Sequence, residues 1–498
     1  MRKVQFRLFL AAAALLAAPG QAAASEVTRV ATAFEDGNRF DIHFGVAYDY
    51  NFRRAAILRE WSRTDGSESS LVKDLVYRQH RHTLTPQLEI GLWNDLALYA
   101  ALPIVVSDNR SYGFDQGADD CVYGDGVPPA LAASCVNKAN STTIRDEIIP
   151  RDGIDARGND PFATFTGPGT EQIFAGPTRR GLDQLHLGLK YGILNQNKRA
   201  HFPTWLIAFE GRFAVGRPMT FSRNLLRDHP DGNHRVGRGI HEIGVWTALS
   251  RRHQFLDPFF RAYWRQALRA AGSMFEDFSG DGAQDRVRPQ SSAGATIGVE
   301  IIPFERKAKS LKVGILLSAS ADLRYGGRGY SEIWELLADS PALVGATDPT
   351  RQRLDAAGNP LDPGYCNRDA ALAYARRNPG DPGYLDAGGA ACQKFQGITT
   401  LQDYASFSFH GALNLELGPH TLLNLGVRVT GDTSHFITAA SPGDADRTEA
   451  GGVDPDRVEP GTSEVNPLRR DVIDAPGRRY AVDDVLDVNG YLRVLILF

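Results

Sequence analysis

The sequence lacks the long apolar stretch that a membrane-spanning helix needs. Such a helix takes about 20 consecutive apolar residues, and the one strongly apolar run, residues 8–18, is shorter and lies near the N-terminus. This disfavours a helical membrane protein. The chain also has no basic excess, since 55 Lys and Arg residues face 59 Asp and Glu residues. We therefore expect no nucleic-acid partner.

Signatures of catalysis and nucleotide binding are missing as well. The sequence contains no Gly-x-Ser-x-Gly motif, and no Ser and His pair stands out as a hydrolase site. No glycine-rich phosphate loop precedes a predicted helix. We therefore predict that the protein is not an enzyme, with a membrane-embedded hydrolase as the alternative.

The N-terminus has the layout of a secretory signal peptide. Arg2, Lys3 and Arg7 precede the apolar run, and the small residues 22–24 precede Ser25. We predict that residues 1–24 are removed, the alternative being an N-terminal anchor. The mature chain then has 52 basic and 59 acidic residues, a net charge of −7.

Cysteine is scarce, with four residues in two local pairs: Cys121 with Cys135, and Cys366 with Cys392. An exported chain meets an oxidising compartment, so we predict disulfides with this local pairing, which closes the shortest loops. The alternative is four free thiols.

The last residues alternate between apolar and polar side chains. Val488, Leu492, Val494, Ile496 and Phe498 share one face, and the opposite face carries Asp487, Asn489, Tyr491 and Arg493. Eleven further segments alternate in this way, near 40–50, 82–92, 96–106, 184–193, 204–215, 239–249, 256–268, 293–302, 311–325, 404–417 and 421–430. Pro86 and Pro258 fit poorly inside strands and indicate either bulges or shifted boundaries.

The connections between these segments alternate in length. Short ones lie near 93–95, 194–203, 250–255, 303–310 and 418–420, and long ones lie near 53–75, 107–182, 216–238, 269–291, 326–403 and 431–486. This rhythm predicts an all-β transmembrane antiparallel up-and-down β-barrel of about twelve strands, with long extracellular loops and short periplasmic turns. We expect residues 25–498 to form this single domain, with large loops at 107–182, 326–403 and 431–486. The alternative is a soluble all-β protein.

The polar faces of the strands predict a lumen with charges of both signs. The residues expected to line it are Asp41, His43, Glu89, His186, Lys190, Glu210, Arg212, Glu242, Lys312, Asp322, Arg324, Glu416, Arg428 and Arg493. They either border a solute path or pair across the barrel and fill it, as side chains do in the smallest barrels.

One long loop has the donor spacing of a calcium site. Asp277, Ser279, Asp281 and Asp285 place oxygen donors at positions 1, 3, 5 and 9, with a glycine after the third. Arg288 occupies the place of the bidentate Glu of a calcium hand, and an acidic loop without metal is the alternative. We expect no other cofactor.

His80 and His82 lie on one face near the predicted outer rim. A metal or lipid-phosphate contact and a solvated rim are both compatible with this spacing.

The terminal strand ending in Phe498 resembles the closing strand of bacterial outer-membrane β-barrels. The resemblance implies the bacterial outer membrane as location, outer-membrane lipid as surroundings, and recognition by the barrel assembly machinery through this strand. The segments 181–191 and 88–103 resemble the strand patterns of outer-membrane transporters associated with phenol meta-pathway degradation, over about a tenth of the chain.

That second resemblance implies uptake of small solutes, aromatic ones among them. We expect a monomeric barrel that acts as a channel or transporter for a small solute, aromatic or hydrophobic in kind. The alternative is a closed barrel that displays its loops for adhesion or partner binding.

Overall fold

The computed structural model describes residues 26–34, 41–62, 69–114, 141–146, 148, 172–196, 198–221, 234–275, 283–338, 340, 343, 345–346, 383–385, 391–393, 395–447, 458 and 464–498. The predicted signal peptide lies outside these residues. So do Cys121, Cys135 and Cys366, and Asp277, Ser279 and Asp281 of the predicted calcium loop. Both of these site predictions remain untested.

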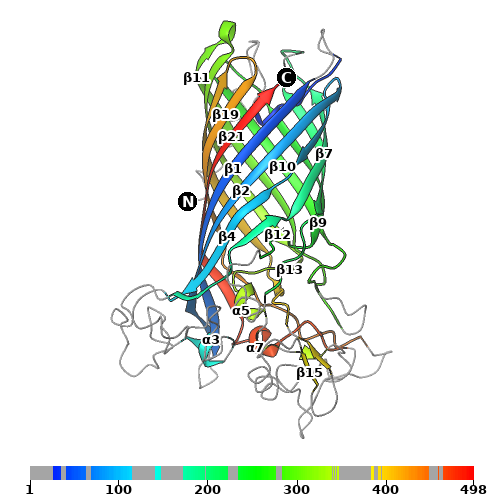
Figure 1. Ribbon diagram of the computed structural model, residues 1–498, viewed down its shortest axis with the longest axis vertical. Helices are drawn as coiled ribbons and strands as arrows, with labels where there is room; N and C mark the ends of the chain where they lie inside the picture. The colour runs from blue at the N-terminus through cyan, green and yellow to red at the C-terminus, as the bar shows by residue number, and fades with distance from the viewer. Residues whose placement is uncertain are drawn as a thin grey trace, which may run out of the picture.

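Within the described residues, twelve antiparallel strands form a closed barrel (Figure 1). Two of them are interrupted: β3 continues as β4 after Leu102 and Pro103, and β6 continues as β7. The strands are β1 (Ile42–Ser62), β2 (Ser69–Trp93), β3 (Leu96–Ala101) with β4 (Ile104–Gly113), β6 (Arg179–Leu182) with β7 (Gln184–Leu194), β8 (Thr204–Ala214), β9 (Ile240–Ser250), β10 (Leu256–Arg269), β11 (Ser291–Arg306), β12 (Leu311–Tyr325), β18 (Tyr404–Leu417), β19 (Thr421–Asp432) and β21 (Tyr480–Leu497).

The barrel closes between its first and last strands. β1 pairs with β21 from His43 opposite Leu497 to Arg59 opposite Tyr480. Beyond the strand, the backbone N–H of Phe498 donates to the carbonyl of Ile42 at 2.9 Å. Closure satisfies backbone groups that an open sheet edge would leave unpaired in hydrocarbon.

The outer wall is apolar and exposed. Phe409 is 73% exposed, and many more apolar side chains point away from the lumen, among them Phe44, Leu88, Leu98, Leu189, Phe209, Ile297, Leu317, Leu413, Leu425 and Leu492. In water such a surface would be unfavourable, whereas a lipid environment matches it. Trp93, Phe255 and Phe304 are exposed beside short turns, where an interfacial aromatic girdle lies. Among the described residues, no helix is long and apolar enough to span a bilayer.

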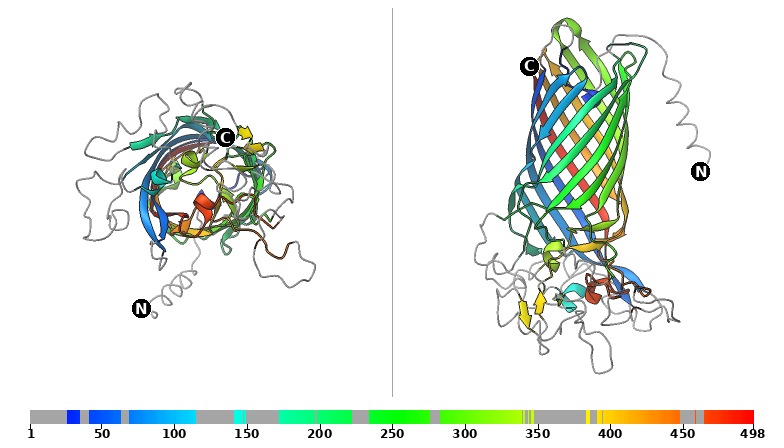
Figure 2. Two further views of the ribbon diagram at one scale, coloured as in Figure 1. Left: turned by 90° about the horizontal axis from the view of Figure 1, so that it is seen from below. Right: turned by 90° about the vertical axis from the view of Figure 1, so that its right-hand side faces the viewer.

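The two ends of the barrel differ, as Figures 1 and 2 show. Short links at 94–95, 195–203, 251–255, 307–310 and 418–420 lie at one end together with Phe498, and we call it the turn end. The opposite, loop end carries the helices α3 (Thr142–Arg145), α5 (Trp334–Leu337) and α7 (Asp471–Asp474), with the short strands β5 (Gln172–Ala175), β13 (Gly327–Gly329), β14 (Gly345–Ala346), β15 (Gly383–Leu385), β16 (Ala391–Gln393), β17 (Thr399–Leu401) and β20 (His435–Phe436).

The predicted long loop at 53–75 is wrong. β1 continues to Ser62 and β2 begins at Ser69, so most of that segment is strand. The lipid-facing alternation stops there because the apolar residues change sides. Ala55, Ile57 and Leu75 are fully buried and pack inward against the loops. A search for outward apolar rows therefore misses this part of the hairpin.

The two prolines inside strands lie where the hydrogen-bond ladder is already interrupted. Pro86 accepts from the N–H of Leu102 at 3.0 Å, beside the break between β3 and β4. Pro258 lies one residue before the pairing of β10 with β9 begins at Phe259. Neither proline therefore removes a ladder bond from an otherwise continuous pair.

Candidate functional site

The inner wall of the barrel collects the polar side chains that the sequence assigns to the lumen. Residues directly opposite each other on paired strands share a face. Glu89 lies opposite His43 on one side and opposite Tyr99 on the other. The ladder continues from Tyr99 through Gly188 to Glu210. The register thus brings predicted lumen residues of distant sequence number into one surface.

Around β2 and β7, the predicted charges pair with each other. The Lys190 ammonium lies 2.5 Å from the Glu89 carboxylate and 5.1 Å from the centre of the Tyr99 ring. His43 lies 3.2 Å from Asp41. Pairing of this kind limits the free-energy cost of charges that are shielded from bulk water.

Glu210 is the centre of a second cluster. It accepts hydrogen bonds from the Tyr99 hydroxyl and the Arg212 guanidinium, both at 2.5 Å. Arg265 lies 3.7 Å away, and Arg212 reaches Glu242 at 3.5 Å. His186 lies opposite Arg212 in the register, so it borders the same cluster.

Aromatic rings are interleaved with these charges. The Arg261 guanidinium lies 4.5 Å from the Trp246 ring centre, and Arg265 lies 4.5 Å from that of Tyr263. The Tyr263 hydroxyl donates to Asp322 at 2.5 Å. Trp246, Tyr263 and the two arginines were not predicted, because β9 and β10 alternate less regularly than the other strands, and the register of β10 against β9 identifies them. Tyr99 was not predicted either, because only the apolar row of β3 was assigned, and the register of β3 against β2 and β7 identifies it.

Two lumen tyrosines lie against glycines of the next strand. A Cβ atom added to Gly188 would lie 2.5 Å from the Tyr99 ring, and one added to Gly426 would lie 2.6 Å from Tyr491. Only glycine leaves room for a ring at these positions. The ring orientation, and with it the hydroxyl position, is therefore set by the neighbouring strand.

On the opposite wall, the lumen is more open. Arg324 and Arg428 lie on the inner faces of β12 and β19, where Arg428 is opposite His410, yet both are exposed. His410 is hydrogen-bonded to the Tyr491 hydroxyl at 2.8 Å. Arg493 lies opposite Asn424 on the same inner surface. Exposed cations that point inward indicate open space beside them.

The N-terminal segment 26–34 enters the turn end of the barrel. It begins with the short 3₁₀ helix η1 (Glu26–Thr28), whose Thr28 hydroxyl is hydrogen-bonded to Ser250 at 2.8 Å. The Arg29 guanidinium donates to Glu416 at 3.1 Å, and the N–H of Ala31 donates to Glu89 at 2.8 Å. These partners come from β9, β18 and β2, so the segment crosses the lumen from wall to wall.

Apolar contacts hold the same segment. Val27 and Val30 pack against a cluster that contains Leu206 and Trp246. Val27 also contacts the cluster of Phe259, Leu316 and Ala412. None of these contacts follows from the sequence pattern, because residues 26–34 do not alternate as a barrel strand does.

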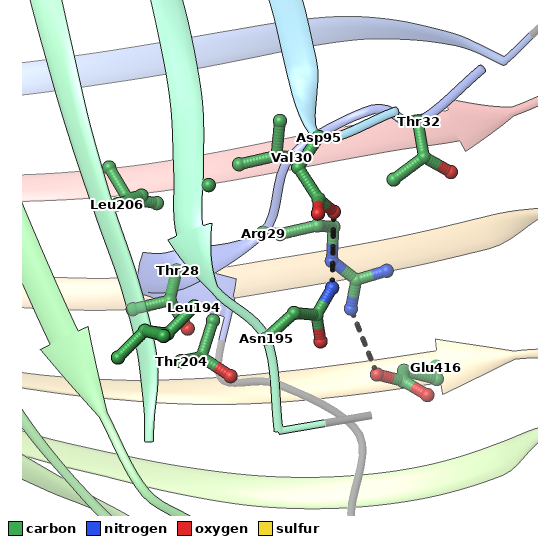
Figure 3. A pocket seen from close by; sticks show the side chains of 11 residues that line it. Thr28, Arg29, Val30, Thr32, Asp95, Leu194, Asn195, Thr204, Leu206 and Glu416 are labelled. Atoms are coloured by element: carbon green, nitrogen blue, oxygen red, sulfur yellow. Dashed lines mark hydrogen bonds and ion pairs between the residues drawn. The ribbon is translucent and has the colours of Figure 1, made fainter. Parts of the chain in front are cut away.

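A cavity of about 210 Å³ lies beside this segment (Figure 3). Thr28, Arg29, Asp95, Asn195 and Glu416 contribute polar atoms to its lining. Asn195 donates to Asp95 at 3.2 Å, and Lys312 lies 3.6 Å from Glu416. The segment therefore narrows the turn end without filling it.

At the loop end, α5 lies across the mouth of the barrel. Ile333, Leu336 and Leu337 pack with residues of β1, β2, β4 and β21, and Trp334 packs with residues of β9 and β10. The residues of the first cluster are Ala55, Ile57, Leu75, Tyr77, Tyr112, Phe114, Ile148, Ile333, Leu336, Leu337, Leu343, Phe395, Leu401, Ile437, Val472, Ile473, Tyr480, Val482 and Val485. We call α5, α7 and the loop residues of this cluster, which pack on the barrel strands, the cap.

A buried ion pair anchors the cap to the barrel. The Arg179 guanidinium donates to Glu335 at 2.7 Å, and both side chains are 0% exposed. The same guanidinium lies 4.9 Å from the Trp334 ring centre. Arg53 on β1 adds contacts to Glu332 at 2.7 Å and to Asp432 at 2.8 Å. None of these residues is among those that the sequence predicts for the lumen.

The closed barrel, its exposed apolar exterior and its charged interior together define an integral β-barrel of the bacterial outer membrane. The predicted fold class and location are thereby confirmed. No family model and no curated protein matches the chain.

Several solved structures are similar to this chain. An outer-membrane channel from Pseudomonas putida F1 aligns with a TM-score of 0.30 and 8% identity, over 91% of this chain and 96% of that one. The outer-membrane protease OmpT from Escherichia coli aligns with a TM-score of 0.26 and 6% identity, over 95% and 100%. A FadL homologue from Pseudomonas aeruginosa aligns with a TM-score of 0.29 and 7% identity, over 92% and 90%.

Proposed function

We propose that the barrel is a non-enzymatic channel that passes a small solute across the outer membrane. The observation that carries the proposal is the exposure of Arg324 and Arg428 on the inner wall, between the cap and the N-terminal segment. A barrel whose side chains filled it would bury these cations against partners. Open space bordered by charges of both signs is suited to transient binding of a polar or amphipathic solute.

The aromatic residues of the lumen favour a solute with a ring. Tyr99, Trp246 and Tyr263 offer ring surfaces beside hydroxyl, carboxylate and guanidinium groups. An aromatic ring can stack on these side chains while its polar substituent finds a hydrogen-bond partner. We therefore propose small aromatic or hydrophobic compounds with one polar group as the substrate class.

Passage requires the N-terminal segment to move. Among the described residues, it is held by hydrogen bonds of Thr28, Ala31, Thr32 and Ala33 and by the ion pair of Arg29 with Glu416. Both side chains are 23% exposed, so the pair contributes only about 0–1 kcal/mol. Each hydrogen bond adds only about 0.5–1.5 kcal/mol, and the segment lies outside the ladder of barrel strands, so it can be displaced while the strands stay in place.

Planar-bilayer recordings test the proposal. We expect small discrete conductance for the full-length barrel, and at least a severalfold increase when residues 26–34 are deleted. Arg29→Ala should give a smaller increase, and Lys309→Ala in a short turn serves as the control without effect. Liposomes that contain the barrel should also admit small phenols faster than liposomes without it. A correctly folded barrel that is silent with and without the segment contradicts the proposal.

The cap supports a second candidate function. A packed loop core with a fully buried Arg179–Glu335 pair is more elaborate than a simple pore requires. It is compatible with a scaffold that displays loops for adhesion or partner binding. Deleting 326–403 discriminates between the two functions. Increased permeability favours the channel, whereas unchanged permeability with lost binding to a cell surface favours the scaffold.

The proposal also includes delivery of a monomeric barrel by the barrel assembly machinery, through the strand that ends at Phe498. Replacing Phe498 with Ala should then lower the amount of folded barrel in the membrane without changing the conductance of the molecules that do insert. Chemical cross-linking in the membrane should give no species larger than one chain.

A further inference from the structure

The outer face of β1 and β2 carries a ladder of hydrogen-bonded tyrosine and histidine side chains. The Tyr48 hydroxyl is 2.7 Å from Nδ1 of His82, and the Tyr50 hydroxyl is 2.9 Å from Nδ1 of His80. The rings also contact each other, with 4.9 Å between the centres of Tyr50 and His82. Phe52 continues the row, 5.0 Å from His80. These side chains point outward, because Tyr48 and Tyr50 belong to the apolar outer row of β1.

Two arginines extend the ladder toward the loop end. Arg54 follows Phe52 on the same outer row of β1, and the register places Arg78 of β2 directly opposite it. On the other side of β2, Arg78 lies opposite Ser111, and His80 lies opposite Asn109. The outer face therefore changes within a few residues from apolar through aromatic to cationic. We call Arg54, Arg78, His80 and His82 the basic patch.

The height of the basic patch matches the membrane interface. Trp93, 65% exposed, marks the turn-end interface on the same strand β2. A strand rises about 3.3 Å per residue and is tilted by about 40°. His82 then lies about 28 Å, and Arg78 about 38 Å, from Trp93 along the membrane normal. The hydrocarbon core is about 30 Å thick and the bilayer with its headgroups about 40–45 Å, so the patch extends from the edge of the hydrocarbon into the headgroups.

This arrangement is particular to one side of the barrel. Near the loop ends of β10 and β12, the outer face instead has Trp264 donating to the Tyr325 hydroxyl at 2.7 Å. This aromatic pair contains no cationic side chain. The strand that flanks β1 on the other side places Leu486 opposite Arg54. At the loop ends of β8 and β9, the outer face has His241 with its ring centre 6.1 Å from that of Phe213. The basic patch differs from both places because it joins two histidines to two arginines.

The hydrogen bonds also fix which histidine atoms face outward. When the tyrosine hydroxyl donates to Nδ1, the ring hydrogen resides on Nε2. Each imidazole then presents an N–H donor beside the guanidinium of Arg78, which binds phosphate oxygens in a planar, two-point manner. In that tautomer the two imidazoles and the two guanidinium groups all present hydrogen-bond donors, and the ligand class that complements them is a phosphate monoester or diester.

We propose that the basic patch binds a phosphate group of an outer-leaflet lipid. The loop end faces the outer leaflet in the outer-membrane barrel pattern. The lipid acyl chains would lie along Tyr48, Tyr50 and the apolar row below, while the phosphate contacts Arg54, Arg78 and the two histidines. The site lies outside the barrel, so it is independent of the lumen and of the proposed transport function.

Binding of lipid A to the full-length barrel in detergent tests the proposal, with dephosphorylated lipid A as the matched ligand. We expect the phosphorylated form to bind at least about tenfold more tightly. The double variant Arg54→Gln/Arg78→Gln should remove that difference, because it removes the charge-assisted hydrogen bonds to the phosphate. His80→Gln/His82→Gln should reduce it partly. Arg306→Gln/Lys309→Gln, which removes two charges at the turn end, should leave it unchanged.

Three results would overturn the proposal. Equal affinity for both lipids would show that the acyl chains alone are recognised. An unchanged preference in the Arg54→Gln/Arg78→Gln variant would place the phosphate elsewhere. Inorganic phosphate that competes at the same concentration as lipid A would show a site for free phosphate rather than lipid. Heat-dependent gel mobility verifies that each variant is a folded barrel, so a folding defect is not mistaken for lost binding.

Discussion

Asp474 illustrates at the scale of one residue how the cap differs from the barrel wall. Its carboxylate is 5% exposed and accepts from the backbone N–H groups of Arg470 at 2.8 Å and Ala440 at 3.1 Å. Burial raises the pKa of Asp474 to about 6, from an ordinary value of 3.8, even though these hydrogen bonds oppose the shift. The folded cap therefore binds a proton at Asp474 more tightly than the unfolded chain does.

The sign of the pH effect follows from this shift. Because the pKa is raised in the folded state, the stabilisation is complete below about pH 4 and is lost as the pH rises to about 6. We predict that hydrogen exchange at Ala440 and Arg470, corrected for the intrinsic rate, shows a cap about 2 kcal/mol more stable at pH 4 than at pH 7. In Asp474→Asn this dependence should flatten. A cap of equal stability at both pH values in the wild type would contradict the prediction.

At the scale of elements, the strand cores could be predicted and their loop ends could not. The outward apolar row of β12, with Ile315, Leu317 and Leu323 exposed, is a requirement of the lipid and is visible as alternation. Above the membrane, the requirement is different, because β1 and β2 must bury Ala55, Ile57 and Leu75 against the loops. This part of the hairpin lacks the outward apolar row by which the other strands were recognised, so it was predicted to be a loop.

The lining of the lumen was predictable in part, because alternation shows which side chains point inward. Alternation places Glu89, Lys190 and Glu210 on the inner face, but it does not show which of them meet. The Glu89–Lys190 pair depends on β3 lying between β2 and β7, which is a matter of strand order. The N-terminal segment and α5 have no periodic signal at all. Their positions depend on contacts with strands that are far away in the sequence.

The cap gives a prediction at this scale. Glu335→Ala leaves the Arg179 guanidinium buried opposite an apolar residue, so we expect the cap to lose about 3–5 kcal/mol of stability. Hydrogen–deuterium exchange should increase in α5 and β17 while the barrel strands keep their protection. Asp471→Ala removes an acid that is 47% exposed and paired with Arg469, and it serves as the control with little effect. Equal exchange in both variants would argue against a structural role for the buried pair.

For the whole molecule, the closed cylinder is the property that the other features depend on. The register places Val46 of β1 directly opposite Val494 of β21, on the outer face. We predict that the double variant Val46→Cys/Val494→Cys forms an intramolecular disulfide in the membrane when an oxidant is added. Val46→Cys/Leu423→Cys is the matched control, because Leu423 lies opposite Val494 on the far side of β21 and should not cross-link with residue 46. A cross-link in the control alone would show a different register.

The path of the N-terminal segment has a consequence for the order of assembly. Its partners Glu89, Ser250 and Glu416 belong to strands from the beginning, middle and end of the chain. They surround the segment only once the last strand has met the first. The first described segment of the chain is thus among the last parts to reach its place. Protection of residues 26–34 from protease would therefore report when β1 and β21 of a molecule have paired and the barrel has closed.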